Sequence, residues 1–339
     1  MKPGEGGQMV KTARSALAFL LVLILAAPPA ALAADQKKSD KEDVSKIGER
    51  NVGKGINLYS LEKEIALGKM LAQQVEQSAK LVDDPVITEY VDRVAQNPVR
   101  NSDARVPFTV KVIDSGEINA FALPGGFFFV NSGLVLAADE EAELAGVMAH
   151  EIAHVTARHG TKQATKGQIA QWAMIPVMIL LPAGAVGYAI YQGLSFGLPL
   201  AFLKFSRNAE READFLGLQY MYKAGYDPTS FITFFEKLRE KERKSPGSVP
   251  KVFSSHPPTK ERVSKAQAEI AELLPAREEY VVTTSEFDQI KQRLAMTMAG
   301  RKLEEQDSDR PTLRTRERKE EEQKKEGEEE KPPVLKRRP

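Results

Sequence analysis

A mostly helical α+β domain with one small mixed sheet is the fold that this 339-residue sequence predicts. Three observations lead to it. Apolar residues first recur at steps of three and four, as in amphipathic helices. Short segments that alternate apolar and polar residues follow, which is typical of strands. A helix with two histidines four positions apart then comes directly after the strands, and further helical segments follow it.

The first elements can be placed from these patterns. Residues 61–94 predict two helices, which Asp83-Asp84-Pro85 separates because proline cannot continue a helix. Alternation then predicts a strand at 108–112. A pair of strands is expected at 119–123 and 127–131, around a Pro-Gly-Gly turn.

The helix after these strands carries the run His150-Glu151-Ile152-Ala153-His154, or H-E-x-x-H. Residues four apart lie about 40° apart on one helix face, so both imidazoles can point at one metal ion. Glu151 is rotated about 100° further, close enough to act as a general base on a water molecule beside the metal. This is the helix motif of zinc peptidases, the zincins. Asp139 is the expected N-cap of this helix, and Gly160 is expected to end it.

A third metal ligand is needed, and several residue types are excluded. The chain has no cysteine. His159 lies nine positions after the first motif histidine, about 180° round the predicted helix. Gly160 stands where a metzincin has its third histidine. Carboxylates and His256 remain, and Glu210 is the best carboxylate, because Asp214 shares its helix face and could hold a ligand imidazole. The alternative is a salt-bridged surface helix.

Four motifs in one order resemble the CAAX-prenyl-protease/HtpX-type family of zinc metallopeptidases, and most closely its periplasmic BepA-like branch. The resemblance covers roughly residues 60–275. Its motifs are N-A-F-A-L-P-G-G at 119–126, H-E-I-A-H-V-x-A-R-H at 150–159, S-R-x-x-E-x-E-A-D at 206–214, and S-H-P-P at 255–258 with Arg262 downstream. The helical repeats of that branch do not follow, and a charged tail takes their place.

The resemblance implies a gluzincin, a zincin whose third protein ligand is a glutamate, with one zinc ion per chain. It implies His150, His154 and Glu210 as zinc ligands and Glu151 as the general base. Asp214 and Arg262 are implied as residues that support the ligands. His256 and Arg262 occupy the family's H-P-x-x-x-x-R position. We therefore expect His256 to take part in the site, either by blocking the zinc or by assisting catalysis. The alternative is a loop histidine without a metal role.

An exposed strand edge offers unpaired N–H and C=O groups that can hold an extended substrate. The strand before the active helix, Asn119-Ala120-Phe121-Ala122, is the candidate for this role. The alternative is a fully paired strand with Phe121 in the core.

The N-terminus predicts a secretory signal peptide over residues 1–33. Lys11 and Arg14 precede an apolar run of about twelve residues, which is too short to span a bilayer, and Ala31-Leu32-Ala33 is an A-x-A site for cleavage before Ala34. An uncleaved membrane anchor is the alternative. After the leader we expect a flexible arm over 34–58.

The zinc metallopeptidase domain is expected over 59–285. Within it, 167–203 carries no charge and predicts an apolar hairpin, which either covers the active site, docks on a membrane surface or inserts into it. Residues 241–258 predict an active-site loop. A charged, largely disordered tail is expected over 286–339, with one helix at 287–298.

The net charge of +1 provides no field for nucleic acid. Together these features predict a secreted, periplasmic zinc metalloendopeptidase whose substrates are polypeptides, namely unfolded or misassembled envelope proteins. Two alternatives stay open: a chaperone-like protein that binds clients and has a latent zinc site, and a membrane-bound protease.

Overall fold

The computed structural model describes residues 40–180, 205–244, 256 and 259–308. The chain divides into two compact units, 1–43 and 44–339, and every element below belongs to the second. The helices are η1 (Val44–Lys46), α2 (Leu61–Ser78), α3 (Pro85–Arg100), η2 (Pro124–Gly126), α4 (Ser132–Ala137), α5 (Glu141–Thr156), α6 (His159–Leu180), α9 (Arg207–Ala224), α10 (Thr229–Lys244), α11 (Lys260–Leu273) and α12 (Ser285–Ser308). The strands are β1 (Thr109–Ile113), β2 (Ala120–Leu123) and β3 (Phe127–Asn131). The predicted α+β class is confirmed.

The sheet is mixed, as expected. Its strand order is β1-β3-β2, with β1 parallel to β3 and β2 antiparallel to β3. The turn between β2 and β3 contains Gly125 and Gly126, whose φ angles of 78° and 88° favour glycine. Because β2 is last in the strand order, it lies at an edge of the sheet, and it packs against α5, the helix that carries the histidine motif.

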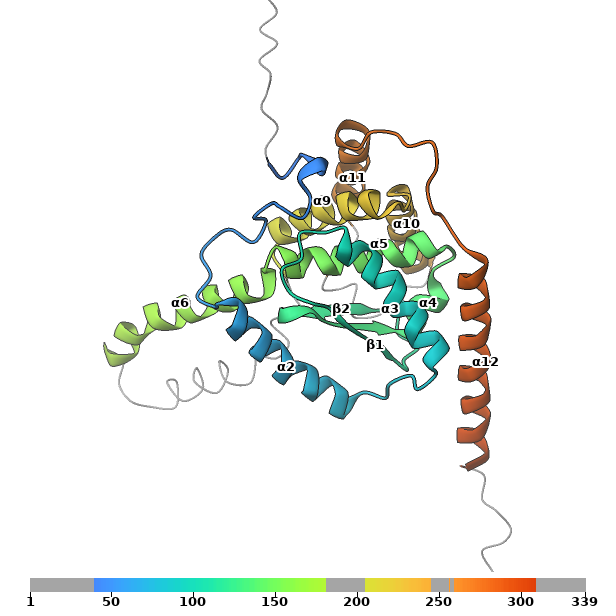
Figure 1. Ribbon diagram of the computed structural model, residues 1–339. Helices are drawn as coiled ribbons and strands as arrows, with labels where there is room; N and C mark the ends of the chain where they lie inside the picture. Colours follow the sequence, from blue (N-terminus) through green and yellow to red (C-terminus); the bar gives the residue numbers. More distant parts are fainter. Residues whose placement is uncertain (1–39, 181–204, 245–255, 257–258, 309–339) are drawn as a thin grey trace, which may run out of the picture. The chain divides into compact units, whose positions relative to one another are not determined.

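The two faces of the sheet pack against different helices. Phe128 and Val130 of β3 point into the main core, which α3, α5 and α9 also build. Their neighbour Phe129 points the other way and forms a smaller cluster with Ala72 of α2. The alternation along β3 thus places α2 on one face and α5 on the other (Figure 1).

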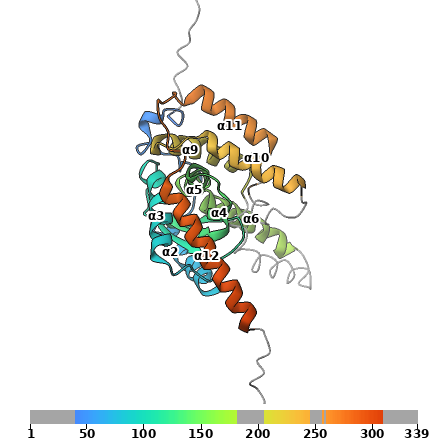
Figure 2. The same ribbon diagram turned by 90° about the vertical axis from the view of Figure 1, so that its right-hand side faces the viewer.

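Helix α5 is the centre of the unit. All of its residues are buried, and it packs on α3, α9, α10 and β2. Both views show α5 between the sheet and the helices α9, α10 and α11 (Figures 1 and 2). Any polar side chain on α5 is consequently held in a dense environment with few possible positions.

Both expected ends of this helix differ from the structure. Its N-cap is Glu140, not Asp139, whose carboxylate pairs instead with Lys237 at 2.9 Å. The helix ends at Thr156 rather than at Gly160, because Arg158 adopts a left-handed φ of 59° and a new helix follows. Arg158 is held there by the Glu64 carboxylate at 2.6 Å.

Residues 44–58 differ from the expected flexible arm. Ile47 and Val52 are buried in the main core. Arg50 forms a buried ion pair with Asp103 at 2.6 Å, with both side chains almost fully enclosed. Asp103 lies 53 residues after Arg50 in the sequence, so the local composition of this segment could not predict the ion pair.

The expected apolar hairpin and tail are only partly within the described residues. Helix α6 covers the start of the hairpin, while 181–204 lie outside, as do the leader (1–33), most of the active-site loop (245–255) and the tail beyond 308. Helix α12 runs to Ser308, about ten residues past the helix predicted at 287–298, and packs on α3 and α4. Among described helices, none combines the length and the apolar character needed to cross a membrane.

Candidate metal centre and substrate cleft

Helix α5 holds His150, Glu151 and His154 side by side. The Nε2 atoms of His150 and His154 are 3.1 Å apart, so both rings point at one place, as their spacing predicts. Both rings are also packed by aromatic neighbours. Phe205 stacks on His154 with ring centroids 4.1 Å apart, and Phe231 stacks on His150 at 5.9 Å.

Helix α9 is set against α5 by two local features of its sequence. Ser206 caps its first turn by accepting the N–H of Ala209, which starts the helix just before its functional residues. Gly217 then allows the two helices to approach closely, because a Cβ at this position would lie 3.1 Å from the main-chain nitrogen of His150. The carboxylates of α9 thereby reach the histidines of α5.

Two of those carboxylates contact the histidines. The oxygens of Glu210 lie 3.5 Å from His150 Nε2 and 3.6 Å from His154 Nε2. Asp214 lies on the same face one turn later, with Oδ1 3.0 Å from His150 Nδ1. Glu210 therefore faces the convergence point of the rings, while Asp214 lies behind His150.

His256 comes to the same place from the segment between α10 and α11. It is buried, and its Nδ1 atom lies 2.8 Å from Glu210 Oε1 and 3.5 Å from His150 Nε2. One ligand atom from each of His150, His154, Glu210 and His256 falls within 4.8 Å of the others. The expected ligands and His256 are thus brought together.

The chemistry of this group fits a divalent metal ion. Three imidazole nitrogens and a carboxylate are donors that zinc binds in four-coordinate sites. Glu210 Oε2 is buried and makes no hydrogen bond among the described residues, although the Arg262 guanidinium lies 3.3 Å away as an ion pair. The imidazole nitrogens that face one another also carry lone pairs that need a partner. A single cation at the centre would bind these nitrogens and the Glu210 carboxylate at once.

Arg262 supports the carboxylates from α11. Its guanidinium binds Asp214 through two contacts, of 2.7 Å and 2.6 Å, and its third nitrogen lies 3.3 Å from Glu210 Oε2. Thr259 caps α11 and accepts the Arg262 N–H, so the start of the helix helps to place this side chain. Asp214 in turn orients His150, which is the supporting role expected for both residues.

A second supporting chain, which the sequence did not predict, lies behind His154. His159 Nδ1 is 3.0 Å from His154 Nδ1, and His159 Nε2 is 3.1 Å from Glu212 Oε2. The rotation argument that set His159 apart from the metal ligands assumed one unbroken helix. The left-handed residue Arg158 turns the chain, so His159 opens α6 and lies against His154. In the sequence, Glu212 is one charged residue among several on its helix, so nothing there predicted its contact with His159.

These contacts set the charge of the site. Burial favours the neutral carboxyl, yet His150 and His256 hold the pKa of Glu210 well below its usual range. Burial would lower the pKa of His150, but Asp214 and Glu210 raise it to about 9. Burial and the neighbouring histidines push the pKa of His154 well below its usual value. The site therefore stabilises positive charge close to Glu210.

Glu151 lies beside this group and is not one of its four ligand atoms. Its nearest carboxylate oxygen is 3.9 Å from His256 Nε2. Burial raises the pKa of Glu151, while the charges of His256 and His150 and the main-chain N–H of Ala122 oppose the shift. A buried carboxylate with a raised pKa is suited to hold and release a proton.

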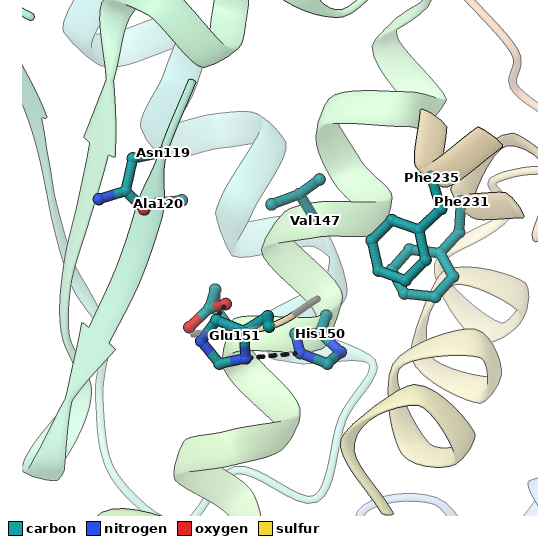
Figure 3. Close-up of a pocket in the computed structure, with 8 residues that line it drawn as sticks. Asn119, Ala120, Val147, His150, Glu151, Phe231 and Phe235 are labelled. Carbon is teal, nitrogen blue, oxygen red and sulfur yellow. Dashed lines mark hydrogen bonds and ion pairs between the residues drawn. The ribbon is translucent and has the colours of Figure 1, made fainter. Parts of the chain in front are cut away.

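The cleft runs along the edge strand β2, on both sides of the four candidate ligands, here called the metal group: His150, His154, Glu210 and His256. At the start of β2, a narrow pocket is lined by residues from β2, α5 and α10 together with His256 (Figure 3). At the end of β2, a second narrow pocket contacts Ala122, His154 and Phe205. The edge strand thus borders the site as the sequence predicts.

The four strand residues proposed for substrate binding lie differently. Asn119 and Ala120 line the first pocket, and Ala122 lines the second. Phe121 points to the opposite face, where its ring stacks on Phe129 with centroids 5.3 Å apart. Its main-chain N–H and C=O also face β3, since Phe121 is paired with Phe129, so Phe121 offers no group to the free edge.

The pocket wall was also missed by the sequence analysis. Val147 lies one turn before His150 on α5, and Phe231 and Phe235 come from α10. Each reads in the sequence as an ordinary apolar core position of a helix. Their spacing of four on α10 indicated a common face, but nothing local showed that this face meets the metal group.

Comparison with known proteins gives one family. Residues 83–270 match the profile described as peptidase family M48. The chain is 31% identical over 249 residues to the beta-barrel assembly-enhancing protease of Escherichia coli K12, which is 71% of this chain and 50% of the relative. It is 32% identical over 222 residues to the protein of the same name from Yersinia pestis, covering 64% and 46%.

A second group of relatives carries another name. The mitochondrial metalloendopeptidase OMA1 of Schizosaccharomyces pombe is 34% identical over 195 residues, which is 56% of this chain and 55% of the relative. The chain thus spans about half the length of the curated relatives that it matches.

Proposed function

This chain belongs to peptidase family M48 and carries its metallopeptidase domain, and from that premise we propose that it is a zinc endopeptidase that cleaves unfolded or misassembled envelope proteins. The observation that carries the proposal is the convergence of two helix histidines, a glutamate and a loop histidine next to a buried glutamate in a cleft. The resemblance found in the motifs agrees with it.

His150, His154 and Glu210 would hold the zinc ion. When bound, zinc supplies Lewis acidity, which lowers the pKa of water and polarises a carbonyl group. Asp214 fixes the orientation of His150, with Arg262 behind it, and His159 contacts the far side of His154. These contacts hold the ligands rigidly, so little reorganisation would be needed on binding.

Glu151 would act as the general base. It accepts a proton from the attacking water, and it then delivers this proton to the nitrogen of the leaving amine. Its burial supports this role, because the raised pKa of Glu151 brings the carboxyl nearer to the range in which a proton is held and released.

Strand β2 would hold the substrate in an extended conformation. The N–H of Asn131 binds the carbonyl of Asn119 at 2.9 Å. In an antiparallel ladder such pairs alternate, so Ala120 and Ala122 turn their N–H and C=O groups away from β3. The Ala122 N–H is bonded to the Glu151 carboxylate, which leaves the Ala122 C=O and both groups of Ala120 for a peptide. A peptide could pair with this free edge and place one bond beside Glu151.

The cellular setting rests on the leader and on the relatives. The A-x-A site at 31–33 supports export through a cleaved signal peptide and a periplasmic location, although these residues lie outside the described part. The bacterial relatives are named for assisting β-barrel assembly, and the OMA1 relatives for a mitochondrial location. The leader favours the bacterial envelope, where substrates would be exposed chains of misassembled proteins.

Removal and return of the metal test this proposal. Treatment with a chelator should abolish cleavage of casein, and about one equivalent of zinc should restore it. Fragments of defined ends should appear only with zinc. A client-binding protein without protease activity would bind casein and leave it intact in both states, and this result would reject the proposal. A membrane-bound protease would sediment with vesicles.

A further inference from the structure

The two histidines of α5 are supported in different ways on the side away from the metal group. Asp214 Oδ1 lies 3.0 Å from His150 Nδ1, so a carboxylate contacts that ring directly. Behind His154 there is first a second imidazole, because His159 Nδ1 lies 3.0 Å from His154 Nδ1. A carboxylate follows at the other nitrogen of that imidazole, with Glu212 Oε2 3.1 Å from His159 Nε2. We call His154, His159 and Glu212 the relay.

The metal side of the relay determines the direction of its hydrogen bonds. A histidine that binds a metal through Nε2 carries its proton on Nδ1, because the ligand nitrogen needs its lone pair. His154 turns Nε2 toward the metal group, 3.1 Å from Nε2 of His150. Its Nδ1–H therefore donates to His159 Nδ1, and the proton of a neutral His159 lies on Nε2, where it donates to Glu212.

The same arrangement follows from the Glu212 end, without any metal. An ionised carboxylate can only accept, so it selects the His159 tautomer that has its proton on Nε2. The Nδ1 atom of this neutral ring can only accept, so it selects the His154 tautomer whose Nε2 carries a lone pair. The relay thus prepares His154 as a ligand before the metal arrives.

Packing keeps both rings of the relay in place. His154 and His159 are buried, with 2% and 5% of their surface exposed. Phe205 stacks on His154 with ring centroids 4.1 Å apart, and its centroid lies 5.9 Å from that of His159. Burial disfavours a charged imidazole, so the neutral form of His159, with one nitrogen able to accept, is favoured here.

A strained turn brings His159 to this position. Arg158 has a left-handed φ of 59°, which is uncommon for a residue with a long side chain. Helix α5 ends at Thr156 and α6 begins at His159, so the ring returns to His154 instead of continuing round α5. Strained residues of this kind are concentrated at functional sites. The result of this one is an imidazole behind a candidate metal ligand.

We propose that His159 and Glu212 are positioning residues that select the His154 tautomer with Nε2 free for zinc. The inference rests on the proposed zinc site and goes beyond it by giving a role to two residues outside the ligand set. If His159 only filled space, an apolar ring at this position would serve as well.

The first test reads the protons on the rings of the zinc-loaded full chain. The chain has four histidines, so NMR of isotope-labelled histidine can resolve each ring, and single substitutions assign them. Nitrogen shifts distinguish protonated, unprotonated and metal-bound ring nitrogens. His159 should carry its proton on Nε2 alone, and His154 on Nδ1 alone. A proton on Nδ1 of His159, or on both of its nitrogens, would overturn the proposal.

The zinc affinity of variants then separates the relay from packing. His159→Phe keeps a ring in place but removes the acceptor, and it should weaken zinc binding by about 10–100-fold, the range for changes behind a ligand. His159→Asn supplies an oxygen near the position of Nδ1 and should restore most of the affinity. Thr161→Val is the matched control, since it removes a buried hydrogen bond to Glu64 from the same helix and should bind zinc as the wild type does. A loss in His159→Asn as large as in His159→Phe would contradict the relay.

Glu212 is tested by a matched pair of substitutions. Glu212→Leu removes the acceptor at the end of the relay and should weaken zinc binding, whereas Glu212→Gln keeps an oxygen that can accept from His159 and should stay close to the wild type. Zinc affinity is measured without a substrate, so the relay can be supported even if the wild type cleaves no casein. Tight zinc binding by the wild type with unchanged affinity in His159→Phe and Glu212→Leu would reject the relay alone. A wild type that binds no zinc would reject the zinc site and the relay together.

Discussion

His150 shows how the site is built at the scale of single residues. One ring nitrogen points at His154, Glu210 and His256, and the other lies 3.0 Å from Asp214. Each contact restricts a different rotation of the ring. The ring of His150 is thus already oriented in the folded protein, so little conformational entropy is lost when the metal binds. This is what residues that support metal ligands provide.

The first prediction at this scale concerns the metal ligands. Glu210→Gln should lose zinc and activity together, because the amide removes the charged ligand. Glu212→Gln, two residues away, should keep zinc, because it leaves every metal ligand in place and its amide oxygen can still accept from His159. Asp214→Ala should lower zinc affinity by about 10–100-fold without abolishing the site. Zinc titration checks all three, and loss of zinc in Glu212→Gln but not in Glu210→Gln would show that the wrong carboxylate was chosen.

The second prediction concerns His256. A closed four-ligand site is inert, whereas catalysis needs an open position for water. Because His256 Nδ1 lies 2.8 Å from Glu210 Oε1, we predict that it blocks the resting site. His256→Ala should then raise basal casein cleavage while zinc stays bound. A fall of about 10²–10³-fold would instead show that His256 stabilises the oxyanion. The segment expected to carry it over the cleft, 241–255, is described only as far as residue 244.

At the scale of elements, the segment before α2 ties distant parts together. Arg50 binds Asp103 with both side chains enclosed, and it donates to Gln219 of α9 at 2.5 Å. Asp103 also accepts a hydrogen bond from Tyr220, which contacts Thr156 at the end of α5. The N-terminal segment thus helps to hold the two helices that carry the metal ligands.

The third prediction tests this connection. Arg50→Ala leaves the Asp103 carboxylate buried without its partner, so it should lower the free energy of unfolding by about 3–5 kcal/mol. Arg243→Ala removes an exposed pair with Glu240 and should leave the free energy of unfolding close to that of the wild type. Chemical denaturation of the zinc-loaded proteins measures both. Equal effects in the two variants would mean that the buried pair contributes no more than an exposed one.

The elements also show what the sequence can and cannot predict. Periodicity placed α2, α3 and the three strands, because their patterns come from burial on one face. The same spacing rule placed the ligands on α5 and α9. The break at Arg158 could not be predicted, since its left-handed conformation depends on Glu64, almost a hundred residues away. The contact between His154 and His159 follows from this break, so it could not be predicted either. The pocket wall from α10 depends on how distant elements pack, which no local pattern indicates.

At the scale of the whole molecule, export is the fourth prediction. The mature protein should begin near Ala34, because the apolar run before it is too short to span a bilayer and ends in an A-x-A site. After a carbonate wash it should stay in the soluble fraction. Mass spectrometry of the protein from the producing cell checks the first residue. A chain that still carries residues 1–33 and sediments with membranes would be an anchored protease instead.

The central claim is that this molecule binds zinc and hydrolyses peptide bonds with Glu151 as its base. The most direct measurement determines zinc content and casein turnover on the same preparations of wild type, Glu151→Gln and the control Glu89→Gln, whose side chain is exposed on α3. All three should bind about one zinc ion. Glu151→Gln should lose about 10²-fold or more in turnover, and the control should match wild type. Equal turnover in Glu151→Gln and wild type would contradict the account.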